Sequence, residues 1–107
     1  MTFAEIGNMI NGTGLANVYD HFTTSPPPPY AVFYLPNQND FFADDSNYCG
    51  RSNLTVELFA KSRDFAHENA LETAFRANGL AWVKSVDFLN DELIYQTTYE
   101  MEVILNG

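Results

Sequence analysis

The sequence has little cysteine, few basic residues and no long apolar run. Cys49 is the only cysteine in 107 residues, which excludes an intramolecular disulfide framework and a cysteine-based zinc site. Five Lys and Arg stand against 14 Asp and Glu, for a net charge of −9. Such an acidic chain is poorly suited to the phosphates of nucleic acid or to an anionic membrane surface. The longest apolar run, Tyr30 to Leu35, is far too short to cross a bilayer.

The N-terminal residues Met-Thr-Phe-Ala-Glu lack the basic region and the apolar core of a signal peptide. We therefore expect a cytosolic protein with no sequence-specific nucleic-acid partner and no membrane partner. The composition is 46% hydrophobic and 15% aromatic, which suits a packed globular fold. A chain of this length forms one domain, over residues 1–107, and its small size favours a homo-oligomer.

Local patterns predict two helices and several strands. Thr2 and Glu5 fit a capping box that starts the first helix, and Gly12 and Gly14 end it. Gly79 has the place of a left-handed terminator for the second helix. In chain order we expect a helix over 1–11, a strand over 17–22, a proline connector over 26–29, a strand over 30–35, a long loop over 36–53, a strand over 54–60, a helix over 63–78, a strand over 80–86, a turn over 88–92 and a long last strand over 93–105.

Two periodic patterns define the expected core. On the second helix the stripe comprises Ala66, Ala70, Leu71, Ala74 and Phe75, and His67, Glu68, Glu72 and Arg76 are expected outside it. Along 93–105 the odd-numbered residues, Leu93 included, are expected on the core face and the even-numbered ones in water. Together with the hairpin-length links, these patterns predict an α+β domain. Its sheet is mostly antiparallel or mixed, with four or five strands, and both helices pack on one face.

The residues that could carry chemistry are few and scattered. His21 is expected on a strand and His67 on the exposed side of a helix, without metal-ligand spacing between them. Cys49 lacks a nucleophile signature, and no phosphate-binding glycine motif or nucleophile elbow occurs. We therefore expect no enzyme, no cofactor and no metal site. The Pro26–Pro29 run matches P-x-x-P, but it lacks the basic flank of a peptide ligand and is expected to be a rigid connector.

The loop after Tyr34 combines aromatic rings with acids. Asp40 to Tyr48 lacks the ligand pattern of a calcium loop. Adjacent rings in such a loop either pack on their own domain or act as anchors at an interface, and both readings stay open. The candidate residues for a subunit or partner interface are Phe41, Phe42, Asp44, Asp45 and Tyr48.

Residues 29–105 also resemble a known family. The segment PYAVFYLPNQNDFFADDSNY, then LTVELFAKSRDFAHENALETAF, then WVKSVDFLNDELIYQTTYEMEVIL resembles small head–tail joining, tail-terminator or tail-completion proteins of tailed bacteriophages and Gram-positive prophages. The most specific part is Y-x-x-x-Y-L-P followed by F-x-A-D-D, at Tyr30–Pro36 and Phe41–Asp45. The Pro26–Pro29 run is more extended than the family pattern.

The resemblance implies a non-enzymatic virion assembly protein. Such a subunit closes into a homo-oligomeric ring, commonly a hexamer, that caps the tail tube and presents a surface to the head connector. The chain would then assemble in the cytoplasm of a bacterial host and end in the virion. One alternative is another small phage structural protein, for head completion or in the minor capsid. The others are a stand-alone ligand- or peptide-binding domain and a cryptic hydrolase that uses Asp44, Asp45 and His21.

Overall fold

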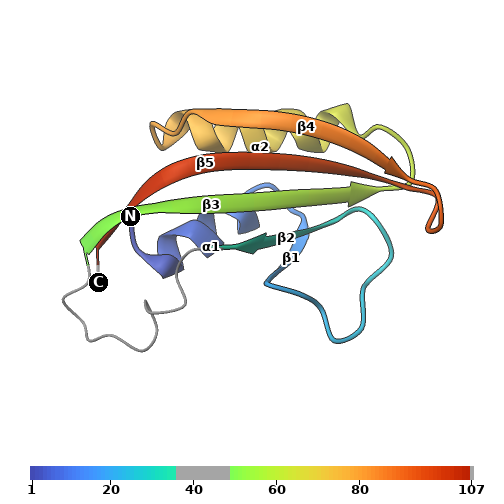
Figure 1. The fold of residues 1–107 in the computed structure, drawn as a ribbon, viewed down its shortest axis with the longest axis horizontal. Coiled ribbons are helices and arrows are strands. Elements are labelled where there is room, and N and C mark those ends of the chain that lie inside the picture. Colours follow the sequence, from blue (N-terminus) through green and yellow to red (C-terminus); the bar gives the residue numbers. More distant parts are fainter. Residues whose placement is uncertain (36–48, 107) are drawn as a thin grey trace.

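The computed structural model describes residues 1–35 and 49–106, which form two helices and one five-stranded sheet (Figure 1). The elements are α1 (Phe3–Asn11), β1 (Ala16–Tyr19), β2 (Tyr30–Tyr34), β3 (Cys49–Ala60), α2 (Phe65–Ala77), β4 (Trp82–Leu89) and β5 (Ile94–Asn106). The strand order is β1-β2-β3-β5-β4, antiparallel throughout except that β1 runs parallel to β2. The predicted α+β class, with a mixed sheet of five strands, is confirmed.

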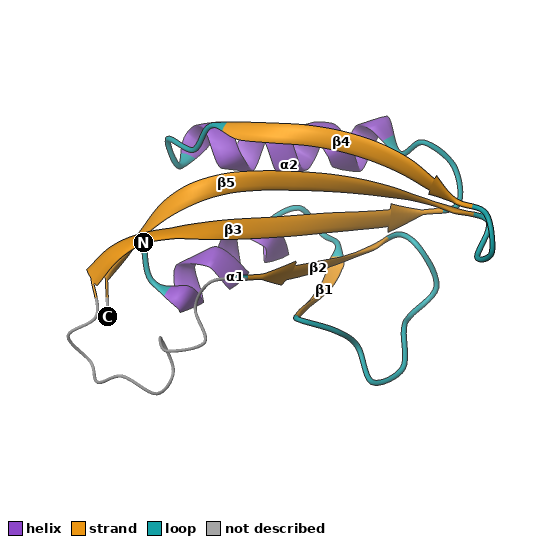
Figure 2. Ribbon diagram, viewed as in Figure 1, coloured by secondary structure: helices purple, strands orange, loops and turns teal. Residues whose placement is uncertain are grey.

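Both helices cover the same face of the sheet, behind the strands in Figure 2. We call this the helix face and the opposite side the open face. The hydrophobic core of the described residues joins both helices to alternate strand residues of the helix face. Its largest fully buried side chains are Tyr99, Phe75, Ile6, Ile10, Leu54, Leu58, Leu71, Leu105, Val56 and Val103.

The alternation predicted for the last strand is confirmed from Thr97 to Leu105. Tyr99 and Met101 are buried on the helix face, whereas Glu100 and Glu102 are exposed on the open face. The prediction for Leu93 was wrong, because this side chain is 68% exposed. Its φ of +54° places it in the turn between β4 and β5, so β5 begins one residue later.

The predicted signals at both helix ends are also confirmed. The Thr2 hydroxyl accepts from the Glu5 N–H and the Glu5 carboxylate accepts from the Thr2 N–H, so the capping box is complete. After α2, Gly79 has a φ of +72°. The Leu80 N–H then donates to the Phe75 carbonyl and the Gly79 N–H to the Arg76 carbonyl, which is a Schellman motif.

Several predicted boundaries were wrong. The loop predicted over 36–53 ends earlier, because β3 begins at Cys49 and pairs with β5 as far as Asn106. The strand predicted over 17–22 ends at Tyr19, because Asp20 has a φ of +72°. The strand predicted over 80–86 runs from Trp82 to Leu89 and takes in the start of the predicted 88–92 turn.

The buried face of α2 differs from the predicted stripe. Leu71 and Phe75 are buried as expected, but Ala66 is exposed and Glu68 is only 2% exposed. The alanines were predicted to face the sheet because they share one helical stripe with Leu71 and Phe75, and because small side chains suit close packing. The helix is instead rotated so that the Glu68 carboxylate faces Arg63 and Lys84. The alanines line a hollow that they share with Met9 of α1.

Candidate functional site

The interface residues predicted from the sequence lie outside the part of the chain that the structure describes. They are Phe41, Phe42, Asp44, Asp45 and Tyr48. Their proposed role at an interface stays a prediction, and so does the hydrolase hypothesis that combines Asp44 and Asp45 with His21. The candidate site must therefore be built from residues 1–35 and 49–106.

The two histidines lie in separate pairs with neighbouring aspartates. The His21 Nδ1 lies 2.7 Å from the Asp20 carboxylate, and both side chains are largely exposed. The His67 Nδ1 lies 2.7 Å from Asp64, which also accepts from the His67 N–H and so caps α2. Burial alone raises the pKa of Asp64, but these hydrogen bonds lower it below its usual value. Within the described ranges, no three potential ligands gather closely enough to hold a metal ion.

A charged network lies between α2 and the helix face of the sheet. The Arg63 guanidinium donates to both carboxylate oxygens of Glu68, each at 3.1 Å. The Lys84 Nζ on β4 lies 2.7 Å from Glu68 and 2.7 Å from Glu72. The Tyr99 hydroxyl, buried beneath the helix, donates to Glu72 at 2.8 Å. Two carboxylates and two cations thus neutralise each other and join three elements.

Electrostatics in this network favour the charged forms. Burial alone raises the pKa of Glu68, but hydrogen bonds from Arg63 and Lys84 outweigh it and hold the pKa below its usual value. Burial alone lowers the pKa of Lys84, yet its hydrogen bonds to Glu68 and Glu72 leave the pKa raised. Burial, and then the bond to Glu72, raise the pKa of Tyr99. Each ionised group is held by its partners, so the network favours a structural role over proton transfer.

Sequence reasoning missed this network, although one signal pointed to it. Lys84 occupies an even-numbered position of β4, between Trp82 and Val86, and therefore lies on the helix face. A cation on that face needs a buried anion. Glu68 and Glu72 are one helical turn apart on α2 and could both have been assigned to it.

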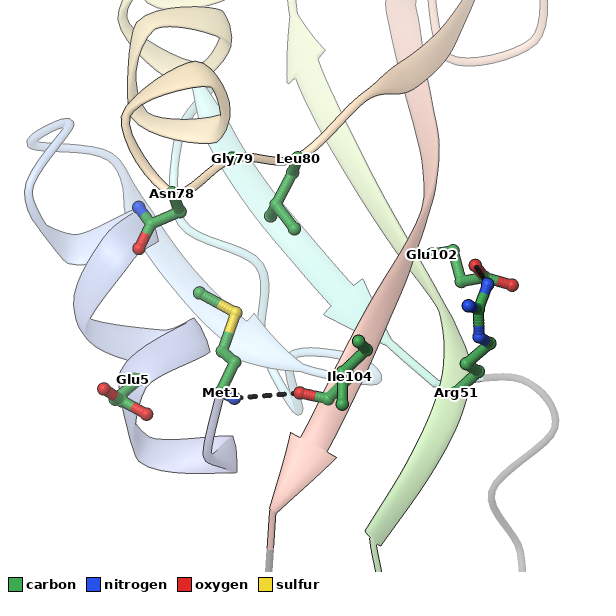
Figure 3. A pocket seen from close by; sticks show the side chains of 8 residues that line it. All are labelled: Met1, Glu5, Arg51, Asn78, Gly79, Leu80, Glu102 and Ile104. Atoms are coloured by element: carbon green, nitrogen blue, oxygen red, sulfur yellow. Dashed lines mark hydrogen bonds and ion pairs between the residues drawn. The ribbon is translucent and has the colours of Figure 1, made fainter.

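A second hollow lies beside the last residues of β5, beyond Met101, where β4 no longer pairs with it (Figure 3). Charged groups at this hollow also form contacts within the subunit. The Met1 ammonium donates to the Ile104 carbonyl at 2.8 Å. On the other side of β5, the Arg51 guanidinium donates to Glu102 at 2.8 Å. No buried side-chain nitrogen or oxygen in residues 1–35 and 49–106 lacks a hydrogen-bond partner. Met1, Arg51 and Glu102 at this hollow are thus each engaged within the subunit.

Several large apolar side chains are exposed on the surface of the described chain. They are Phe65, Val83, Phe88, Leu93 and Ile104. Val83 and Ile104 lie on the open face, toward the end where β4 begins. Phe65, Phe88 and Leu93 lie at the opposite end, where α2 begins and the β4–β5 turn lies. Exposed side chains of this kind are typical of protein interfaces.

The open face is acidic as well as partly apolar. Strand alternation places Glu57, Asp87, Glu100 and Glu102 on it, with Arg51 as the single basic residue that the described strands contribute. The Arg51 guanidinium is engaged by Glu102. The open face therefore suits a basic partner, or a lumen that repels anionic polymers.

The sequence matches no protein-family model and no curated protein. The resemblance to phage head–tail proteins therefore stays a prediction, together with the partners and the location that it implies. Neither helix of the described chain has the length and apolarity needed to span a membrane.

Proposed function

We propose that this chain is a non-enzymatic structural subunit of a tailed phage, which forms a homo-oligomeric ring, caps the tail tube and connects it to the head. One observation carries the proposal. Large apolar side chains are exposed at two separate sites, with Val83 70% exposed on the open face and Phe65 65% exposed at the far end. Two different apolar sites on one subunit suit a head-to-tail contact, which closes into a ring when the rotation closes.

The charge distribution agrees with this role. A ring through which DNA passes gains from an acidic inner surface, because carboxylates repel the phosphates. On the open face, Glu57 and Asp87 are the best candidates for that surface. The helix face has its charges paired within the subunit and is better suited to the outside of the ring.

The described side chains also support a structural rather than a catalytic protein. His21 is paired with Asp20 on the surface, and the buried charges of the network are satisfied by one another. The segment that resembles the phage family, residues 29–105, spans four of the five strands and α2. The hexameric state and the contacts with tail-tube and head-connector proteins belong to the proposal.

The proposal can be tested by locating the chain in virus particles. An antibody raised against the purified chain would be applied to particles produced by the genome that encodes it, with gold-labelled detection in the electron microscope. We expect label at the head–tail junction or at the head-proximal end of free tails. Particles that contain no trace of the chain, by label and by mass spectrometry, would contradict the proposal.

A further inference from the structure

The first feature that carries this inference is an exposed aromatic side chain with two bases beside it. Phe65 opens α2 and is 65% exposed. The Arg63 guanidinium lies 4.6 Å from the centre of the Phe65 ring, and Lys61 is exposed in the same short link. Aromatic and Arg side chains are the commonest energetic anchors of interfaces. We call Lys61, Arg63 and Phe65 the aromatic knob.

The second feature is a hollow on the open face. It has a volume of about 480 Å³ and is lined by Asn53, Thr55, Ala81, Val83, Glu100 and Glu102. Val83 supplies an apolar surface that is 70% exposed, and the two glutamates supply negative charge beside it. This open-face hollow is large enough for an aromatic ring.

The two features cannot meet within one subunit. Phe65 begins the helix that covers the helix face, at the end of the sheet where Tyr95 of β5 pairs with Ala60. Val83 lies on the opposite face, six residues before the far end of β4, which is about 20 Å along a strand. A contact between knob and hollow must therefore join two copies, and it is heterologous when the knob and the hollow of one copy engage two different neighbours, as in the proposed ring.

We propose that the aromatic knob of one copy docks into the open-face hollow of the next, with the Phe65 ring against Val83 and Lys61 facing Glu100. The occupant is a second copy of this chain because both shape and charge match. A protruding ring meets a hollow, and the exposed base Lys61 meets the exposed acid Glu100 on a molecule that is otherwise strongly acidic. This contact specifies the ring proposed above and rests on that proposed function.

The β4–β5 turn is a poorer candidate for the same hollow and supplies a matched control. Leu93 is 68% exposed, almost the same as Phe65. However, the exposed acids Asp91 and Glu92 precede it, and they would repel Glu100 and Glu102. A substitution at Leu93 thus replaces an apolar side chain that is exposed to nearly the same fraction, without touching the proposed contact.

The test is the self-association of the purified full chain, measured by sedimentation velocity over a range of concentrations at low salt. We expect Phe65→Asp to weaken self-association by about 30-fold or more, as for an interface hot spot, and Leu93→Asp to leave it unchanged. Circular dichroism and the Tm of each variant establish that it is folded. A wild-type chain that stays monomeric at about 1 mM, or equal effects of the two variants, would overturn the proposed contact.

A charge exchange tests the electrostatic part independently of the Phe65 variant. Lys61 and Glu100 are both exposed, and Glu100 is chosen because Arg51 already engages Glu102. Lys61→Glu and Glu100→Lys should each weaken self-association, and the double variant should restore it. Two additive losses, without any restoration, would contradict the proposed pairing.

A mixing experiment tests the direction of the contact. Phe65→Asp destroys the knob but leaves the hollow, whereas Val83→Asp destroys the hollow but leaves the knob. Each variant alone should be monomeric. An equimolar mixture should form a 1:1 complex that adds no further copies, because the pair uses the one intact knob and the one intact hollow. Absence of that complex would refute the head-to-tail contact. Gold label at the head–tail junction, with that result, would leave the proposed function standing and show that other surfaces build the ring.

Discussion

At the residue scale, Glu68 is the buried acid that joins α2 to two cations, Arg63 and Lys84. Its side chain is 3% exposed, and its carboxylate accepts from Arg63 and Lys84, whose own side chains are 34% and 31% exposed. We expect Glu68→Gln to lower the free energy of unfolding by about 2–3 kcal/mol, because two cations then lose their shared counter-ion. Urea unfolding measures this loss. Glu92→Gln in the exposed turn is the control and should change it by less than about 0.5 kcal/mol.

The same carboxylates predict how stability depends on pH. Burial raises the pKa values of Glu68 and Glu72, but hydrogen bonds from their partners outweigh it, so both values lie below the usual one. Their contribution is therefore complete above the unfolded pKa of about 4.3 and is lost as pH falls through the lower folded values. We expect the urea midpoint to fall steeply from about pH 4.3 downward. Glu72→Gln should flatten that fall, and an unchanged slope would count against the network.

At the element scale, the end of α2 sets where β4 begins. Gly79 has a φ of +72°, and a Cβ built on it meets no atom within 4 Å, so backbone strain is the only cost of a side chain there. We expect Gly79→Ala to destabilise the fold by about 1–2 kcal/mol. Gly12 at the end of α1 has a φ of −63° and is the matched control. Gly12→Ala should be neutral or stabilising by up to about 1 kcal/mol. Thermal unfolding compares the two, and equal effects would contradict this account of Gly79.

The elements also show what the sequence could and could not predict. The capping box of Thr2 and Glu5 and the alternation along β5 are local patterns, and both were predicted correctly. The start of β3 at Cys49 was not, because Gly50, Arg51 and Asn53 have no strand pattern of their own. Long-range pairing with β5 fixes that segment. The rotation of α2 toward Lys84 depends likewise on a residue distant in the chain.

At the scale of the whole molecule, the interface predicted from the sequence and the contact proposed from the structure involve different segments. The predicted residues Phe41 and Phe42 lie outside the described ranges, and no local pattern distinguishes Phe65 or Val83 from core residues. Their exposure follows from the position of the α2 start and from the alternation of β4, and both are known only once the strands are paired. Exposed apolar surfaces of this kind are properties of the folded domain.

The prediction for the Phe41–Phe42 segment can be tested separately. Phe41→Asp combined with Phe42→Asp should leave the fold intact and abolish tail completion if these rings contact a neighbouring subunit. If they instead pack on their own domain, burying two charges should unfold the chain. Circular dichroism and counts of completed tails distinguish the two results. A folded variant that completes tails normally would remove both residues from the interface.

The proposal that this chain completes phage tails is tested most directly by deleting its gene from the phage genome that encodes it. Particles would be counted by electron microscopy, with and without the wild-type chain supplied in trans. The account predicts unjoined heads and tails of irregular length in the deletion, and normal particles on complementation. Normal yields of infectious particles, with full-length tails joined to heads, would contradict it.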